Sequence, residues 1–229
     1  IYWLEGLRSS NAYLVDSEEG LLLVDGGMSA DVPRIVNQIE SLGRAMTEVE
    51  GIVVTHAHGD HTGGVAELVR RSDAEVMAHR DEVPYIEREK DLPARSLVQG
   101  AIRWLDARIS GQGERVAVTK PLDDSDRLPF LGGLRVIHTP GHTPGSISLY
   151  QEERCVLFCG DLLFNGDLFT GRGGLRQSPR FFSADPDQAE RSLHALGSLD
   201  VRVLCVGHGE PLVMGSSVTM DSVLENVRA

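Results

Sequence analysis

Residues 51–64 of this chain read GIVVTHAHGDHTGG. The apolar run at 51–55 predicts a buried strand, and the spacing of the apolar residues in 65–69 predicts a helix directly after this segment. The turn between them carries four side chains of types that bind metals, namely His56, His58, Asp60 and His61. The sequence therefore predicts a cluster of metal ligands at the carboxyl end of a strand.

The spacing within this turn suits a divalent cation. Side chains two apart in an extended segment point the same way, so His56 and His58 can reach one ion. Asp60 and His61 follow where the chain turns towards the helix. Neutral imidazole and carboxylate are ligands that zinc prefers. A polar loop that is rich in histidine by chance is the alternative, and four ligands within six residues disfavour it.

Three further residues of the same kinds lie later in the chain. His142 lies in the turn TPGHTPGS, Asp161 follows the apolar run at 155–159, and His208 follows the apolar run at 201–206. A turn rich in proline and glycine holds a side chain at low entropic cost. A lone carboxylate beside a buried strand is costly unless it is paired or bound to a metal. Each has an ordinary structural explanation singly, but together they favour one shared site.

The composition bounds the size of the protein and its partners. With 229 residues, 41% of them hydrophobic, the chain is predicted to form a single domain over 1–229, with a helical, lid-like insertion around 81–113. No apolar run approaches the roughly 18 residues that span a bilayer, and the first residues lack a secretory signal. A net charge of -12 without a run of Lys and Arg disfavours a nucleic-acid partner.

The three cysteines are predicted to be core residues rather than redox or metal-binding residues. Cys159 and Cys205 lie within apolar runs that predict buried strands, and Cys155 is the third cysteine. Free cysteines fit a reducing compartment, so the expected location is the cytoplasm.

The pattern of apolar runs is similar in the two halves of the chain. Strands are predicted at 21–24, 51–55, 75–79, 116–118, 134–138, 147–150, 155–159 and 201–206, and helices at 35–42, 65–69 and 185–196. Each half contains, in order, a strand, a turn with Gly and Asp, a helix, and a buried strand that ends at a histidine. This pattern predicts an α/β protein whose two halves face one another across one crevice.

In this order the motifs resemble those of the metallo-β-lactamase superfamily, in its glyoxalase II-like branch. The motifs that carry the resemblance are Val24-Asp25-Gly26-Gly27, the turn at 56–61, Pro140-Gly141-His142, Gly160-Asp161 and Gly207-His208-Gly209. The resemblance covers almost the whole chain. It implies an αββα four-layer sandwich, in which two mixed sheets pack together with helices outside and metal ions lie between the sheets.

The resemblance also implies a set of ligands. The first metal would be held by His56, His58 and His142, and the second by Asp60, His61 and His208. Asp161 would bridge the two metals, and Asp25 would steady a ligand. Two divalent ions are expected, most simply Zn²⁺, although the same ligands accept iron or manganese.

The activity implied is hydrolysis with a dinuclear centre. Two metals can share a hydroxide at neutral pH and polarise a carbonyl group. Asp60 would hold that hydroxide and take its proton, and Asp161 would hold both metals at the catalytic centre. The expected substrate is a small acyl compound, namely a thioester, an ester or a lactone. The sequence does not fix the oligomeric state, and a homodimer is compatible with it.

Several branches of the family share this ligand set. Asp161 stands where β-lactamases have Cys or Ser, which disfavours antibiotic hydrolysis, and the acidic balance disfavours an RNase Z. Few residues follow His208, which puts glutathione recognition in doubt, and Phe164 stands where lactonases have Tyr. A sulfur (persulfide) dioxygenase with a single iron is the main alternative. A non-catalytic metal-binding module would lack a ligand, and none is missing.

The residues after Asp161 are candidates for binding the substrate. The aromatic rings of Phe164 and Phe169 would contact an acyl chain, and Arg172 and Arg176 would hold a carboxylate or phosphate. A solvated loop with its phenylalanines packed inward is an equal alternative. The remaining histidines, His79, His138 and His194, are predicted to be ordinary structural or surface residues.

Overall fold

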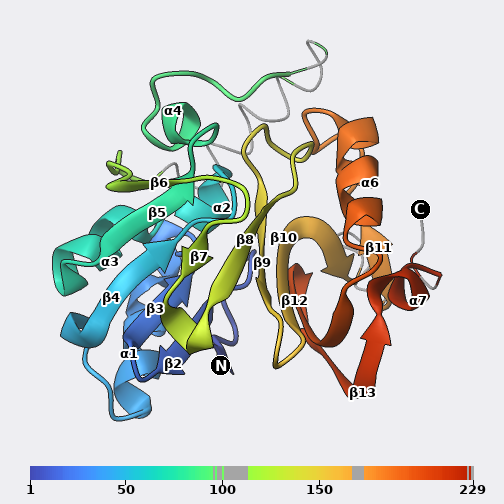
Figure 1. The fold of residues 1–229 in the computed structure, drawn as a ribbon. Coiled ribbons are helices and arrows are strands. Elements are labelled where there is room, and N and C mark those ends of the chain that lie inside the picture. The colour runs from blue at the N-terminus through green and yellow to red at the C-terminus, as the bar shows by residue number, and fades with distance from the viewer. Residues whose placement is uncertain (95, 97–99, 101–112, 167–172, 226, 228–229) are drawn as a thin grey trace.

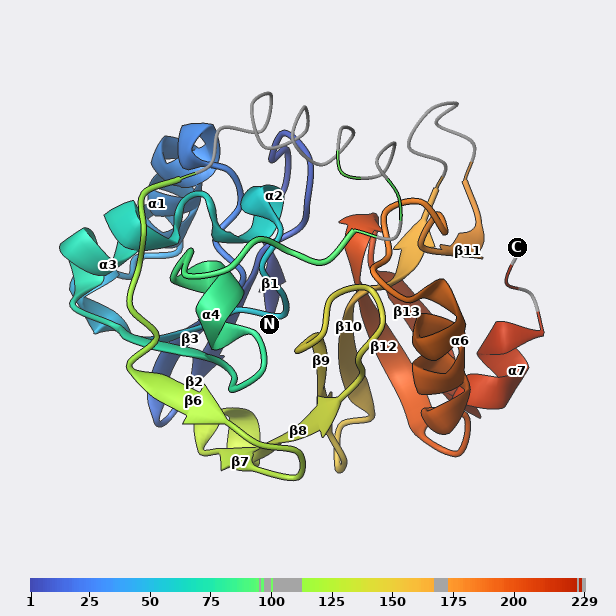
Figure 2. The same ribbon diagram turned by 90° about the horizontal axis from the view of Figure 1, so that it is seen from above.

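Two mixed β-sheets form the centre of the computed structural model, which describes all residues except 95, 97–99, 101–112, 167–172, 226 and 228–229. The first sheet has the strand order β1-β2-β3-β4-β5-β6, and the second has the order β13-β12-β10-β9-β8-β7 with β11 paired to β10. The two sheets lie face to face, with helices on their outer sides (Figure 1). Seen from above, the four layers run from α1 and α3 on one side to α6 and α7 on the other (Figure 2).

The first half of the chain builds the first sheet and the helices that cover it. Its strands are β1 (Tyr2–Trp3), β2 (Tyr13–Ser17), β3 (Gly20–Val24), β4 (Val49–Val53), β5 (Glu75–His79) and β6 (Lys120–Leu122). Its helices are α1 (Val32–Ser41), α2 (Gly59–Thr62), α3 (Val65–Ser72) and α4 (Val83–Ile86).

The second half builds the second sheet. Its strands are β7 (Arg127–Leu128), β8 (Leu134–His138), β9 (Ile147–Gln151), β10 (Val156–Asn165), β11 (Leu175–Gln177), β12 (Asp200–Gly209) and β13 (Leu212–Thr219). Its helices are α6 (Pro186–Ala195) and α7 (Met220–Leu224). Among the described residues, no helix is both long and apolar enough to cross a membrane.

The sandwich follows from the alternation of side chains along its central strands. On β3, Leu21 and Leu23 pack against the helices of the first half, whereas Leu22 and Val24 face the other sheet. On β10, Phe158 faces the first sheet and Leu157 packs with the helices of the second half. Successive side chains of a strand point to opposite faces, so a strand that is apolar on both faces must be covered on both. Three apolar layers result, and the predicted αββα fold is confirmed.

Strand direction brings the candidate ligands to one edge. β3, β4, β5 and β6 run parallel, as do β10 and β12, so the ends of these strands that carry candidate ligands lie at the same edge.

The sequence placed Asp161 just after a strand that ends at residue 159. In the structure Asp161 lies within a strand, because β10 continues to Asn165. The ladder between β10 and β12 is irregular there, with register shifts between Phe158 and Gly160 and between Gly160 and Phe164. Irregularities of this kind re-aim a side chain next to a functional site.

The structure corrects two features of the sequence-based assignment. Residues 116–118 are not a strand, because the Val118 N–H donates to Glu87 Oε1 at 2.9 Å and the ladder begins only at β6. Their apolar alternation still marks burial, since Val116 and Val118 join the layer between the first sheet and its helices. The strands β1, β2, β6, β7, β11 and β13 were not predicted. Of the predicted insertion at 81–113, the described part includes α4, and most of its second half lies outside the described residues.

Cys159 and Cys205 behave as predicted, whereas Cys155 is only partly buried and is not a core residue. Cys159 and Cys205 are buried in the apolar layers, and all three cysteines are free thiols. Burial raises the pKa of Cys159 to about 12, so this thiol is protonated at neutral pH.

Replacing Phe158 with Ala is expected to destabilise the fold strongly. The ring is 1% exposed, lies between the sheets and meets Tyr13 edge-on at 5.5 Å between centroids. Its loss leaves a cavity, so the free energy of unfolding should fall by about 3–5 kcal/mol in urea denaturation. Val213→Ala is the control, because Val213 is 76% exposed and its truncation should change stability by less than about 0.5 kcal/mol. Equal effects of the two changes would contradict the layer assignment.

Candidate metal centre

The loop after β4 carries four of the seven predicted ligands and is held by close backbone packing. His56 and His58 lie on its extended part, and α2 then turns the chain back. The Gly26 N–H donates to His61 O at 2.8 Å. A Cβ on Gly64 would lie 2.3 Å from Gly26 O, so only glycine allows this approach. The loop after β3 and the ligand loop are thereby locked together.

The turn between β8 and β9 presents His142. Gly141 has φ +130°, a conformation that favours glycine, and its carbonyl accepts the Asp185 N–H at 2.8 Å at the start of α6. The hydroxyls of Ser178 and Ser183 lie 3.2 and 3.3 Å from His142 Nδ1. The ring is therefore fixed through Nδ1, and Nε2 faces the site.

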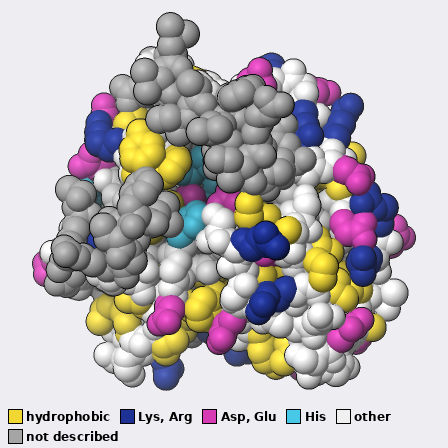
Figure 3. All heavy atoms as spheres, turned by 180° about the vertical axis from the view of Figure 1, so that it is seen from behind, with side chains coloured by type: hydrophobic (Ala, Val, Ile, Leu, Met, Phe, Trp, Pro, Cys, Tyr) yellow, Lys and Arg dark blue, Asp and Glu magenta, His cyan; other side chains and the backbone are white. Residues whose placement is uncertain are grey.

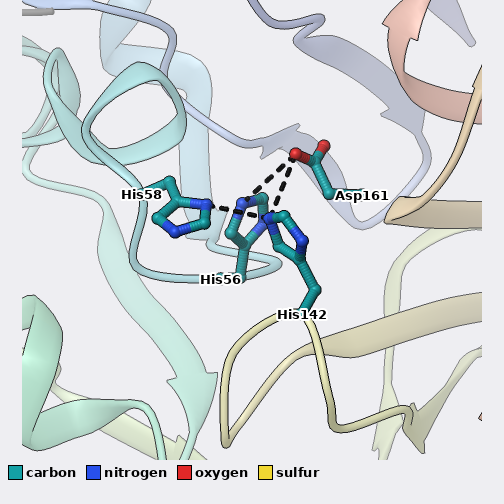
Figure 4. Close-up of side chains that lie close together, drawn as sticks. All are labelled: His56, His58, His142 and Asp161. Atoms are coloured by element: carbon teal, nitrogen blue, oxygen red, sulfur yellow. Dashed lines mark hydrogen bonds and ion pairs between the residues drawn. The ribbon is translucent and has the colours of Figure 1, made fainter. Parts of the chain in front are cut away.

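Asp161 lies at the centre of the cluster. Its Oδ2 is 3.2 Å from His208 Nε2, 3.3 Å from His142 Nε2 and 3.7 Å from His56 Nε2. Its Oδ1 is 3.2 Å from His61 Nε2. Figure 4 shows this carboxylate facing the rings of His56 and His142, with His58 beside them. One buried carboxylate thus faces imidazoles from both sheets.

The seven predicted ligands form two adjacent groups that could each hold a metal ion. The first group is His56, His58, His142 and Asp161, and the second is Asp60, His61 and His208. Within each group the potential ligand atoms lie within 4.8 Å of one another. This is the division that the resemblance implied, and Asp161 adjoins both groups.

Buried polar atoms that make no hydrogen bond show that the cluster fits a cation. The buried atoms His56 Nε2, His61 Nε2 and Asp161 Oδ1 make no hydrogen bond. Buried polar groups are ordinarily hydrogen-bonded, because an unmade bond costs the full desolvation penalty. Nitrogen and carboxylate oxygen atoms converging on one space are the donor set of zinc or a similar divalent ion. The residues present therefore fit the metals that the family implies.

The charges of the cluster are strongly coupled. Burial disfavours the ionised carboxyl group of Asp161, but the surrounding imidazoles, His208 first, outweigh burial and hold its pKa well below its usual range. Burial lowers the pKa of His56, so this ring is neutral. Burial also opposes protonation of His61, but the carboxylates of Asp161 and Asp25 outweigh it and raise its pKa. A metal ion and a proton therefore compete for His61, because a ligating imidazole is neutral.

Asp25 lies beneath the second group, in a left-handed conformation with φ 61° at the end of β3. Its carboxylate accepts hydrogen bonds from Thr55 N at 2.7 Å and Thr55 Oγ1 at 2.8 Å, and it lies 2.8 Å from His61 Nδ1. A carboxylate on the far nitrogen fixes the tautomer and orientation of a ligating ring. The geometry therefore supports the predicted steadying role.

The segment before β2, which no sequence pattern indicated, orients the second group. Ser9 Oγ donates to Asp60 Oδ2 at 3.0 Å, and Ser9 O lies 3.2 Å from His208 Nδ1. Asn11 N donates to Gly207 O at 2.7 Å, and Asn11 Nδ2 donates to Gly209 O at 2.6 Å. These hydrogen bonds hold the chain on both sides of His208. No local pattern signals them, because their partners lie between 51 and 199 positions away.

A third cluster of the described residues, His79, Asp81 and His138, lies apart from the site. The rings of His79 and His138 are stacked, with centroids 3.9 Å apart and planes at 10°. The lone pairs of parallel rings do not converge on one ion. His79 Nδ1 accepts the Asp81 N–H at 3.2 Å, and His138 Nε2 lies 3.0 Å from Pro144 O. This arrangement agrees with the structural role predicted for both histidines.

Of the residues predicted to bind substrate, Phe164 and Arg176 are described, whereas Phe169 and Arg172 lie outside the described residues. Phe164 is 1% exposed, and its ring centroid lies 4.4 Å from that of His208. The ring therefore packs against a candidate ligand instead of lying open to solvent. Arg176 is half-buried on β11, opposite Phe164 in the ladder. On the face shown in Figure 3, histidine side chains lie next to acidic ones in a hollow.

A family model for the metallo-β-lactamase superfamily matches residues 6–208. This match covers most strands of both sheets and every candidate ligand, so the chain belongs to that superfamily. Its family and its fold are those that the motifs indicated.

Among its relatives is the probable metallo-hydrolase YflN of Bacillus subtilis (strain 168), which is 29% identical over 220 residues, or 90% of this chain and 83% of the relative. A hydroxyacylglutathione hydrolase of Shewanella sp. (strain ANA-3) is 30% identical over 193 residues, or 83% of this chain. The matched region spans 58% of the length of that hydrolase. The solved structure of TTHA1623 in a di-iron-bound form is 30% identical, with a TM-score of 0.67, and the match covers 95% of this chain and 93% of that one.

Asp25→Asn is expected to weaken metal binding by about 10- to 100-fold, because the side-chain NH₂ group cannot accept a hydrogen bond and would face one of the donors from Thr55 and His61. Competition with a chromophoric chelator measures the affinity. Asp31→Asn is the matched control, since Asp31 is equally buried and accepts the backbone N–H groups of Met28 and Arg8, away from the ligands. Equal affinities in the two variants would show that Asp25 does not act on the site.

Proposed function

We propose that this protein is a metal-dependent hydrolase that cleaves the thioester, ester or lactone bond of a small acyl compound with a dinuclear centre. The observation that carries the proposal is the buried carboxylate of Asp161, which adjoins two groups of ligands and lies among buried nitrogen atoms that make no hydrogen bond. His56, His58 and His142 would hold one ion, and Asp60, His61 and His208 the other, with Asp161 shared. Relatives named as metallo-hydrolases support the class of reaction.

When bound, two divalent ions would supply a hydroxide at neutral pH and Lewis acidity towards a carbonyl oxygen. The chain itself supplies the placement of Asp60, whose Oδ2 is held by Ser9 Oγ at 3.0 Å and lies 3.6 Å from His208 Nε2. A carboxylate held in this way can accept the proton of the attacking water. Because water would be the nucleophile, the proposed reaction needs no serine or cysteine side chain for that role.

Two features support an acyl substrate within the superfamily. Asp161 supplies a carboxylate at the position that the two groups of ligands share. The β-lactamases, whose motifs otherwise resemble this pattern, have Cys or Ser at that position. Hydroxyacylglutathione hydrolases are among the relatives, although this chain matches only between 45% and 58% of their length. We infer zinc as the metal from the donor set, and the di-iron-bound neighbour makes iron the competing choice.

The test combines metal content with turnover. Elemental analysis of the purified protein should find about two metal ions per chain. Hydrolysis of a panel of thioesters, esters and lactones should be lost on chelation and restored by Zn²⁺. One iron per chain, with oxygen uptake on a persulfide and no acyl hydrolysis, would place the protein with the sulfur dioxygenases instead.

Asp60→Asn should lower kcat by about 10²- to 10⁴-fold, because the amide cannot accept the proton that the carboxylate accepts. Metal content must be measured in parallel, since Asp60 is also a candidate ligand. Asp81→Asn is the control, because this aspartate is exposed and outside both groups. Full activity in Asp60→Asn with both metals bound would exclude Asp60 as the base.

A further inference from the structure

Glu82 is a buried acid that belongs to neither group of ligands. It follows β5 at the N-terminal cap of α4, and its side chain is 0% exposed. Burial raises the pKa of this carboxyl group to about 7, against the hydrogen bonds that favour its ionised form. A buried carboxyl group is costly unless it is hydrogen-bonded, so its partners indicate what it does.

The two oxygens of Glu82 reach the two loops that carry the first group of ligands. Oε1 accepts the Ala57 N–H at 2.7 Å, and Ala57 lies between His56 and His58. Oε2 accepts the Gly145 N–H at 2.6 Å, three residues after His142 in the turn between β8 and β9. One loop belongs to the first sheet and the other to the second. A single carboxylate therefore joins two segments that are otherwise on separate sheets.

The turn also packs directly against the backbone of Glu82. A Cβ on Gly145 would lie 2.4 Å from Glu82 N, so the two chains are in close contact. The Glu82 N–H donates to His79 O at 2.8 Å, which fixes the residue at the end of β5. The carboxylate is thus anchored to the first sheet and aimed at both loops.

We propose that Glu82 is a positioning residue that sets the spacing between His56 and His58 on one loop and His142 on the other. This role rests on the metal centre proposed above. All three histidines of the first group lie on the two loops that Glu82 joins. The second group is held by other contacts, since Ser9 orients Asp60 and His208, and Asp25 orients His61. Glu82 therefore acts on one metal site and not on the other.

A carboxylate suits this role because it only accepts hydrogen bonds, and the backbone groups of Ala57 and Gly145 that face it are both donors. Glutamine has the same shape but one accepting oxygen, so its NH₂ group would face one of the two N–H donors. Aspartate keeps the charge but is one methylene shorter, so it cannot reach both loops. Glu82→Gln and Glu82→Asp thus separate the effect of the double contact from the effect of charge.

The experiment is a Co²⁺ titration of the metal-free protein, followed by visible absorption. In Glu82→Gln, one of the two Co²⁺ equivalents should bind about 10- to 100-fold more weakly, while the other stays within about threefold of the unaltered protein. Repeating the titration in a His208→Ala background, which lacks a ligand of the second group, assigns the weakened step to the first group. Glu82→Asp should weaken the same step.

Glu87→Gln is the matched control. Glu87 ends the same helix, and its Oε1 accepts the Val118 N–H at 2.9 Å, away from the ligands. Circular dichroism and urea unfolding of each variant report whether it folds, and Glu82→Asp serves if Glu82→Gln does not. Unchanged Co²⁺ affinities in the Glu82 variants, or equal weakening of both steps, would overturn the proposed role. Failure of the unaltered protein to bind Co²⁺ would instead overturn the metal centre itself.

Discussion

The buried carboxylate of Asp161 is the constraint on which the rest of the site depends. Four imidazoles surround it within 3.7 Å, and they come from loops and strands of both sheets. A charge in this position is stable only if opposite charges or metal ions accompany it. The two sheets must therefore hold the histidines to within a fraction of an ångström. The three apolar layers of the sandwich supply that rigidity.

The support of the site comes from outside the ligand motifs. Asp25 fixes His61, Ser9 fixes Asp60 and His208, and Glu82 joins the loops that carry the remaining histidines. Each of these residues uses an acceptor or donor matched to a backbone group, a ring nitrogen or a carboxylate oxygen. Such partners orient ligands before a metal arrives, which reduces the entropy lost on binding. The candidate ligands are thus held by several separate hydrogen bonds, and the rigid sandwich supports the residues that make them.

The sequence predicts what local patterns encode. The ligand turn at 56–61 and the central apolar strands follow from alternation and spacing, whereas the sandwich and the family follow from the resemblance that the order of the motifs carries. The roles of Ser9 and Glu82 could not be predicted, because each depends on contacts between segments far apart in the sequence. The strand expected at 116–118 failed because alternation reports burial, whereas pairing depends on where each N–H finds its acceptor. The position of Asp161 within β10 depends on a ladder irregularity that composition does not reveal.

The central claim is that two metal ions share Asp161. Anomalous diffraction from a crystal of the metal-loaded protein, collected on both sides of the metal absorption edge, tests it most directly. The account predicts two peaks about 3.5–4 Å apart. One peak should be bound by His56, His58 and His142, and the other by Asp60, His61 and His208, with Asp161 between them. A single peak bound by one group, or no peak at Asp161, would contradict the account.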